Sequence, residues 1–125
     1  NCARPAHLPV DGTAKQLFAG ANHTCMRQQG GQTLCWGRGE SQELGAGHEM
    51  TNLAEPVQIS TSFDSMSAGG SYDYQNMEGT GHSCAITFDG RLVCWGANTD
   101  GALGNGSTDD TGNPEAIAFE ATCRN

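Results

Sequence analysis

The stretch that decides the fold is Cys84-Ala-Ile-Thr-Phe-Asp-Gly-Arg-Leu-Val-Cys94, which continues directly into Trp95-Gly96. If Cys84 faces Cys94 across a hairpin, the pairing leaves Phe88-Asp89-Gly90 as a three-residue loop. Such loops commonly end in a glycine with a left-handed backbone, and Gly90 stands at that position. The stretch therefore predicts two antiparallel strands with their cysteines opposed.

The same hairpin occurs a second time in the chain. Cys25 and Cys35 bracket the loop Gln29-Gly30-Gly31, again with glycine third. A constant offset of 59 positions relates the following pairs: His23 and His82, Cys25 and Cys84, Cys35 and Cys94, Trp36 and Trp95, Leu44 and Leu103. Because fixed spacing at several residue types marks a structural repeat, we infer that the chain is a duplication.

Both repeats have the pattern of strands and turns. Short apolar runs alternate with clusters of Gly, Asn, Asp and Ser, and apolar residues do not recur at helical spacing over twelve residues. The sequence predicts an all-β fold of two four-stranded antiparallel units. We expect an N-terminal segment at 1–16, the first unit at 17–65, the second at 66–118 and a tail at 119–125.

The opposed cysteines predict disulfides Cys25–Cys35 and Cys84–Cys94, since directly paired antiparallel residues have Cα atoms about 4.5 Å apart, within disulfide range. Cys2 and Cys123 remain, and they either close the domain or link neighbouring chains. Two alternatives stay open: six reduced thiols, or a zinc site at His23, Cys25 and Cys35. The zinc spacing is unfavourable, because ten positions separate the two thiols.

Disulfides point to an oxidising compartment and an extracellular protein. The formal net charge of −8 argues against nucleic acid as a partner, because phosphate contacts need clustered Lys and Arg. The sequence holds no apolar run of membrane-spanning length and no leader-like start at Asn1, so a secreted protein would be in its mature form here. Leu, Ile, Val and Phe make up only about 14 % of the residues, which predicts a weak core.

Four segments resemble repeats of the regulator of chromosome condensation family: Met66-Ser-Ala-Gly-Gly-Ser71, Gly81-His-Ser-Cys-Ala-Ile-Thr87, Asp89-Gly-Arg-Leu-Val-Cys-Trp-Gly96 and Gly101-Ala-Leu-Gly-Asn-Gly106. The resemblance implies four-stranded blades of a propeller with about seven blades, built from repeats of about 50 residues. The paired cysteines are similar to those of secreted members. Residues 72–80 depart from the family pattern as an insertion in the second repeat.

Two blades do not close a ring, because propellers typically have four to eight. We therefore expect a non-catalytic extracellular structural or interaction protein that assembles with copies of itself, as a ring or a filament, or docks on another protein. The alternative is part of a secreted propeller that acts as a binding or inhibitory module. Nucleotide exchange on a small GTPase, the role of the family founder, is a third and weaker reading.

The remaining candidate residues carry little chemistry. Asn22-His-Thr24 and Asn105-Gly-Ser107 are acceptor patterns for N-linked glycans. Trp36, Trp95, His23 and His82 recur with the repeat, which favours packing within the blades. His7 and His48 have no recognisable partner. The acidic stretch around Asp100, Asp109 and Asp110 lacks the spacing of a calcium loop and favours a solvated turn. We expect no catalytic residues, no metal and no cofactor.

Overall fold

The structure, a computed structural model, describes residues 12–46, 52–59, 62–76 and 78–116. Within these residues every regular element is a strand. The strands form two four-stranded antiparallel sheets, in each of which strands that follow one another in the sequence are neighbours. The first sheet holds β1 (Ala14–Ala19), β2 (His23–Gln28), β3 (Thr33–Gly37) and β4 (Leu53–Gln58). The second holds β5 (Phe63–Asp73), β6 (Glu78–Thr87), β7 (Leu92–Gly96) and β8 (Thr111–Ala116). The predicted fold class is confirmed.

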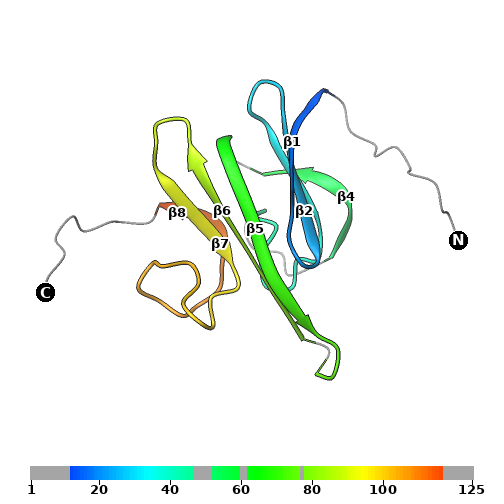
Figure 1. Ribbon diagram of the computed structural model, residues 1–125, viewed down its shortest axis with the longest axis vertical. Coiled ribbons are helices and arrows are strands. Elements are labelled where there is room, and N and C mark those ends of the chain that lie inside the picture. Colours follow the sequence, from blue (N-terminus) through cyan, green and yellow to red (C-terminus); the bar gives the residue numbers. More distant parts are fainter. Residues whose placement is uncertain (1–11, 47–51, 60–61, 77, 117–125) are drawn as a thin grey trace, which may run out of the picture.

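The two sheets lie side by side, with β5 next to β1 and β2 (Figure 1). Both are meanders in which each strand pairs with the next, the arrangement of a propeller blade. Together they do not form a closed ring. No helix long and apolar enough to cross a membrane is found in the part of the chain that the structure describes.

Both hairpins have the predicted register. Cys25 pairs with Cys35 and Cys84 pairs with Cys94, with Cα atoms 4.1 Å apart in each pair and a disulfide closed across it. Gly90 has a φ of +87°, the left-handed conformation that a three-residue loop needs at its last position. The bonded thiols exclude the reduced and zinc-bound alternatives for these four cysteines. Cys2 and Cys123, like His7 and His48, lie outside the described residues.

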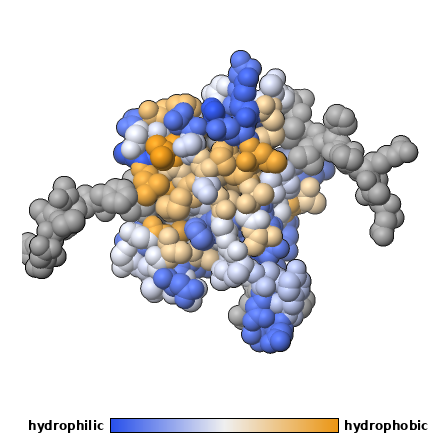
Figure 2. Space-filling model, in the orientation of Figure 1, coloured by the Kyte–Doolittle hydropathy of each residue, from blue (hydrophilic) through white to orange (hydrophobic). Residues whose placement is uncertain are grey.

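The insertion at 72–80 forms the end of the β5–β6 hairpin. Strand β5 has 11 residues where β1 has 6, and the ladder continues from Gly70–Gly81 out to Asp73–Glu78. At the tip, the Asp73 carboxylate accepts hydrogen bonds from the backbone N–H groups of Gln75 and Asn76. These hydrogen bonds lower the pKa of Asp73. The hairpin projects beyond the rest of the sheet as a hydrophilic tip (Figure 2).

The core lies between the two sheets. One buried cluster combines residues of β2, β3, the loop after β3 and the position after β4 with residues of β5, β6 and β7: Cys25, Cys35, Leu44, Ile59, Phe63, Met66, Ala85, Val93 and Trp95. Because side chains alternate along a strand, each sheet contributes only one face. The first sheet uses the face with its disulfide, whereas Val93 and Trp95 of the second sheet lie opposite its disulfide.

Candidate interaction site

The junction between the sheets holds a network of buried polar groups. It is built by the loop that follows β3, residues 38–46, which reaches across from the first sheet to the second. Leu44 of this loop is buried in the shared core. Gly45 has a φ of +71° and lies against the Trp95 indole, so closely that an added Cβ would stand 2.7 Å from Nε1. Glycine is required here for both reasons.

The carbonyl oxygen of Glu43 is the acceptor that joins the two sheets. Trp95 Nε1 donates to it at 2.9 Å, and Ser83 Oγ donates to it at 3.3 Å. Since the Ser83 hydroxyl has one proton and gives it to this carbonyl, it accepts at 2.8 Å from His23 Nε2. A chain of three hydrogen bonds therefore links β2, β6 and β7 through a single loop carbonyl.

The Glu43 side chain is also buried, with 1 % of its surface exposed. Arg38 Nη1 pairs with Glu43 Oε1 at 2.9 Å, and the Ser41 backbone N–H donates to Oε2 at 2.7 Å. Burial raises the pKa of Glu43 even though these partners favour its charged form. The partners therefore offset the desolvation of the carboxylate and hold the loop in one conformation.

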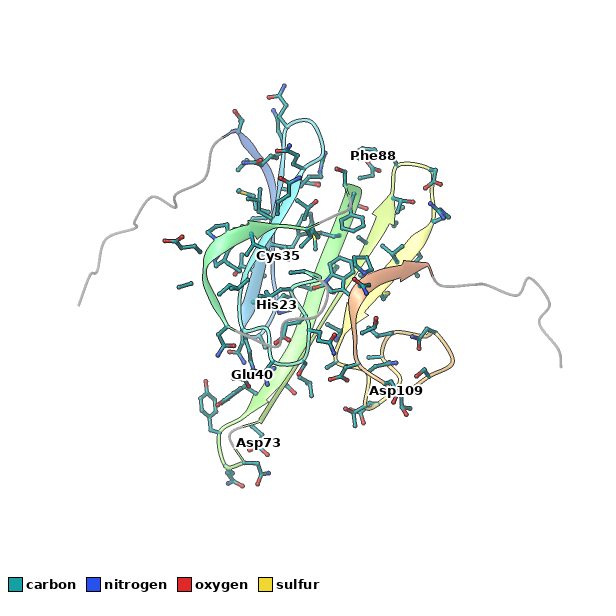
Figure 3. The ribbon with its side chains drawn as sticks, turned by 180° about the vertical axis from the view of Figure 1, so that it is seen from behind. His23, Cys35, Glu40, Asp73, Phe88 and Asp109 are labelled. Carbon is teal, nitrogen blue, oxygen red and sulfur yellow. A yellow bond between two sulfur atoms is a disulfide. The ribbon has the colours of Figure 1, made fainter. Side chains whose placement is uncertain are left out.

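The repeated histidines occupy different environments. His23 lies between the sheets (Figure 3) and is 3 % exposed. Burial, and then the charge of His82, lower the pKa of His23 to about 4, so its imidazole is neutral at neutral pH. His82 is half-buried beside Ala97 and Ala102, on a face of the second sheet that no described residue of the first sheet covers.

The repeated tryptophans differ in the same way. Trp95 is fully buried and stacks on Phe63 with ring centroids 5.3 Å apart. Trp36 is half-buried, on the face of the first sheet that lies opposite the Cys25–Cys35 disulfide. Both therefore lie on equivalent faces of their sheets, but only one of those faces is covered by a neighbouring sheet.

The two sequon asparagines lie in loops. Asn22 precedes β2 and is exposed, whereas Asn105 is half-buried. The Asn105 side-chain oxygen accepts from the backbone N–H of Ser107 at 3.0 Å and from Asn98 Nδ2 at 3.1 Å. The Asn22 side chain is the more accessible of the two.

The loop after β7 is organised by Asn98, the first residue of the acidic stretch, whose role as a buried hydrogen-bonding centre was not predicted from the sequence. Asn98 is 1 % exposed. Its side-chain oxygen accepts a hydrogen bond from the backbone N–H of Leu103, and its Nδ2 group donates to the backbone carbonyls of Ser107 and Asp109. The Asp110 carboxylate accepts from the backbone N–H of Asn98. Asp100, Asp109 and Asp110 belong to this solvated loop, and the described residues hold no group of three or more potential metal ligands.

Glu43 and Arg38 were also missed, because the second repeat has Ala102 and Ala97 at the equivalent positions. The signal available was a charged residue directly before the repeated Leu-Gly pair. Its burial becomes apparent only when the loop is seen to insert between two sheets.

Residues 79–102 match the Regulator of chromosome condensation (RCC1) repeat. The chain is an RCC1-like repeat protein. Human E3 ubiquitin-protein ligase HERC2 is 36 % identical over 88 residues, which are 70 % of this chain and 2 % of that protein. Protein RCC1 of Candida albicans is 31 % identical over 119 residues, or 86 % of this chain and 24 % of the relative.

Solved propellers have the same architecture. Yeast RCC1 (Prp20), in a crystal structure bound to Kap60, superimposes with a TM-score of 0.73 at 25 % identity, covering 93 % of this chain and 27 % of that one. Human WBSCR16 superimposes with a TM-score of 0.75 at 23 % identity, covering 93 % of this chain and 29 % of that one. The chain thus spans about a quarter of these two proteins, and its RCC1-like blades suggest an interaction module.

Proposed function

We propose that this RCC1-like protein is a non-catalytic, extracellular interaction module that assembles with further copies of itself. One observation carries the proposal. The second sheet covers the centre of the first sheet's disulfide face, where Cys25 and Cys35 are 0 % exposed. No described sheet packs on the equivalent face of the second sheet, where Ile86 is 45 % exposed and Cys84 is half-buried, although Cys94 and Leu103 are buried.

That open face is apolar and hollowed. Ser65, Ser67, Cys84, Ile86 and Leu92 line a depression of about 230 Å³. Apolar residues gather over the region of β5, β6 and β7 in Figure 2. A repeat unit buries its apolar face against a neighbouring unit, so a further blade-like sheet is the occupant that fits.

The extracellular location is supported by the two disulfides, which are typical of oxidising compartments. The sequons at Asn22 and Asn105 would carry N-linked glycans in a eukaryotic secretory pathway. Expression of the chain through such a pathway, followed by intact-mass measurement before and after deglycosylation, tests both sites. A mass unchanged by the enzyme removes glycosylation from the proposal.

Light scattering of the purified, disulfide-bonded chain tests self-assembly. We expect a mass above the 13.1 kDa of one chain that rises with concentration. A mass of one chain at every concentration overturns the proposal.

A second candidate is a binding module that forms part of a longer propeller. It is favoured by the length comparison, because the chain covers only 24 % of a 31 % identical RCC1 relative. In that case the open faces contact further blades of one polypeptide. The light-scattering result separates the two, since only the first candidate requires isolated copies to associate.

A further inference from the structure

The contact between the two sheets uses unlike surfaces. The first sheet contributes its disulfide face and the loop 38–46, and the second contributes the face that bears Trp95. Because the sheets are repeats, each of them carries both kinds of surface. Two surfaces are therefore left over, one at each end of the pair: the Trp36 face of the first sheet and the disulfide face of the second.

The Trp36 face is defined by Leu17, Met26, Leu34 and Trp36. Leu17 pairs with Met26 in the first sheet as Met66 pairs with Ala85 in the second, so Leu17 and Met66 are equivalent. Met66 is 8 % exposed because the first sheet covers it, whereas Leu17 is 67 % exposed. On the Trp36 face, Leu17 therefore lacks the cover that Met66 has, Leu34 and Trp36 are half-buried, and Met26 is 5 % exposed.

The other surface, which we call the Ala102 face, comprises the disulfide Cys84–Cys94, Ile86, Leu92 and the loop residues 102–104. The 59-residue offset makes Ala102, Leu103 and Gly104 equivalent to Glu43, Leu44 and Gly45. Gly104 has a φ of +69° and Gly45 a φ of +71°, so the two loops have the same backbone at this point. An added Cβ at Gly104 would meet nothing within 4 Å, which is the space an indole fills at Gly45.

One pair of residues differs between the repeats in a compensating way. Glu43 lies against Gly81, and a Cβ added to Gly81 would stand 3.1 Å from the Glu43 Cγ. The residues equivalent to this pair in the leftover surfaces are Ala102 and Asn22. The larger Asn22 stands where the second repeat has Gly81, and the smaller Ala102 stands where the first repeat has Glu43. The two leftover surfaces therefore retain complementary shapes.

We propose that a second copy of this chain docks head to tail, with its Trp36 face on the Ala102 face of the first copy. By equivalence with the internal contact, Trp36 Nε1 of one copy donates to the Ala102 carbonyl of the other, and His82 reaches the Thr24 hydroxyl. This inference deepens the proposed self-assembly and rests on it. A contact between unlike surfaces propagates to a ring or a filament.

The docking geometry has a consequence for glycosylation. Asn22 stands where Gly81 stands in the internal contact, directly against the loop of the neighbouring sheet. A glycan on Asn22 therefore occupies the volume of the docked copy, and assembly requires chains without it. Asn105 is equivalent to Ala46, which is exposed at the end of the loop 38–46, so a glycan on Asn105 leaves the contact free.

Two single variants and their mixture test the proposal on the full chain, with disulfides intact and without glycans. Leu17→Arg blocks the Trp36 face and Ala102→Arg blocks the Ala102 face, and both side chains are exposed in the single chain. Tyr74→Arg, on the hairpin tip and 81 % exposed, is the matched control. We expect the wild type and Tyr74→Arg to assemble in light scattering, and each face variant to have the 13.1 kDa mass of one chain.

The mixture gives the decisive result. Each face variant retains one intact surface, so an equimolar mixture forms a dimer of twice the single-chain mass and nothing larger. This dimer also shows that both variants are folded. If the wild type assembles but either variant still assembles alone, the docking surfaces are wrong while self-assembly stands. If the wild type stays monomeric, the proposed function itself fails.

Discussion

At the scale of single residues, the two repeats act as internal controls for each other. Gly45 and Gly104 have the same left-handed backbone, but only Gly45 touches the Trp95 indole. Placing alanine at a left-handed position costs about 1–2 kcal/mol, and overpacking a contact costs about 1–3 kcal/mol more. The backbone cost of an alanine is therefore the same at both glycines, and only the contact with Trp95 makes the substitution more costly at Gly45.

We predict that Gly45→Ala lowers the free energy of unfolding by about 1–3 kcal/mol more than Gly104→Ala does. Urea unfolding followed by tryptophan fluorescence measures both, at concentrations low enough to keep the chain monomeric. Equal losses for the two variants would show that the loop does not press on Trp95.

His23 makes stability depend on pH. Its pKa falls from 6.5 to about 4 on folding, so the unfolded chain binds this proton at a higher pH than the folded chain does. The free energy of unfolding therefore decreases as the pH is lowered from about 6.5 to about 4, by about 3 kcal/mol from this group. Glu43 acts in the opposite direction, because its raised pKa favours the folded state on acidification.

The difference between the wild type and His23→Gln isolates the histidine, since glutamine keeps a donor for Ser83. We expect the variant to lose less stability than the wild type between pH 6.5 and pH 4, by about 3 kcal/mol. Thermal or urea unfolding across this range measures it. Parallel pH profiles for the two proteins would contradict the burial of a neutral imidazole.

At the scale of elements, the sequence determined the hairpins in detail. The opposed cysteines and the third-position glycines fixed the register and the loops, because a hairpin is a local structure with few alternatives. The loop 38–46 was not foreseen. Its role depends on a neighbouring sheet 40 or more residues away in sequence, as the separation of 40 between Ser83 and Glu43 illustrates. Local patterns carry no record of such a contact.

The two disulfides differ in their surroundings, and this sets a prediction. Each closes a loop of sequence separation 10, for which the loss of chain entropy in the unfolded state is worth about 3 kcal/mol. Cys25 and Cys35 are both fully buried between the sheets, whereas in the second disulfide Cys94 is buried and Cys84 is partly exposed. Replacing Cys25 and Cys35 by alanine therefore also leaves a cavity in the core.

We expect the Cys84→Ala, Cys94→Ala double variant to lose about 2–4 kcal/mol of its free energy of unfolding. The Cys25→Ala, Cys35→Ala double variant should lose more than that. Chemical denaturation of both double variants measures the difference. A larger loss for the second pair would place the better-packed disulfide on the other sheet.

At the scale of the whole molecule, composition alone pointed to a weak core, and the structure shows how the chain compensates. Its buried cluster is shared between the sheets rather than divided into two cores. The hydrogen bonds from Trp95 and Ser83 to the Glu43 carbonyl add a polar link across the same boundary. The residues of this cluster become buried only when the two sheets pack against each other.

This sharing predicts that the two sheets unfold as one unit. Native-state hydrogen exchange compares strand amides of β2 and β3 with those of β6 and β7, and we expect their slowest exchange to report the same opening free energy. The reason is that opening either sheet exposes the core of the other. Trp95→Phe, which removes the hydrogen bond to Glu43, should lower protection in both sheets together. If β6 and β7 keep their protection while β2 and β3 exchange, the sheets are independent units and the loop 38–46 is a surface contact rather than the link between them.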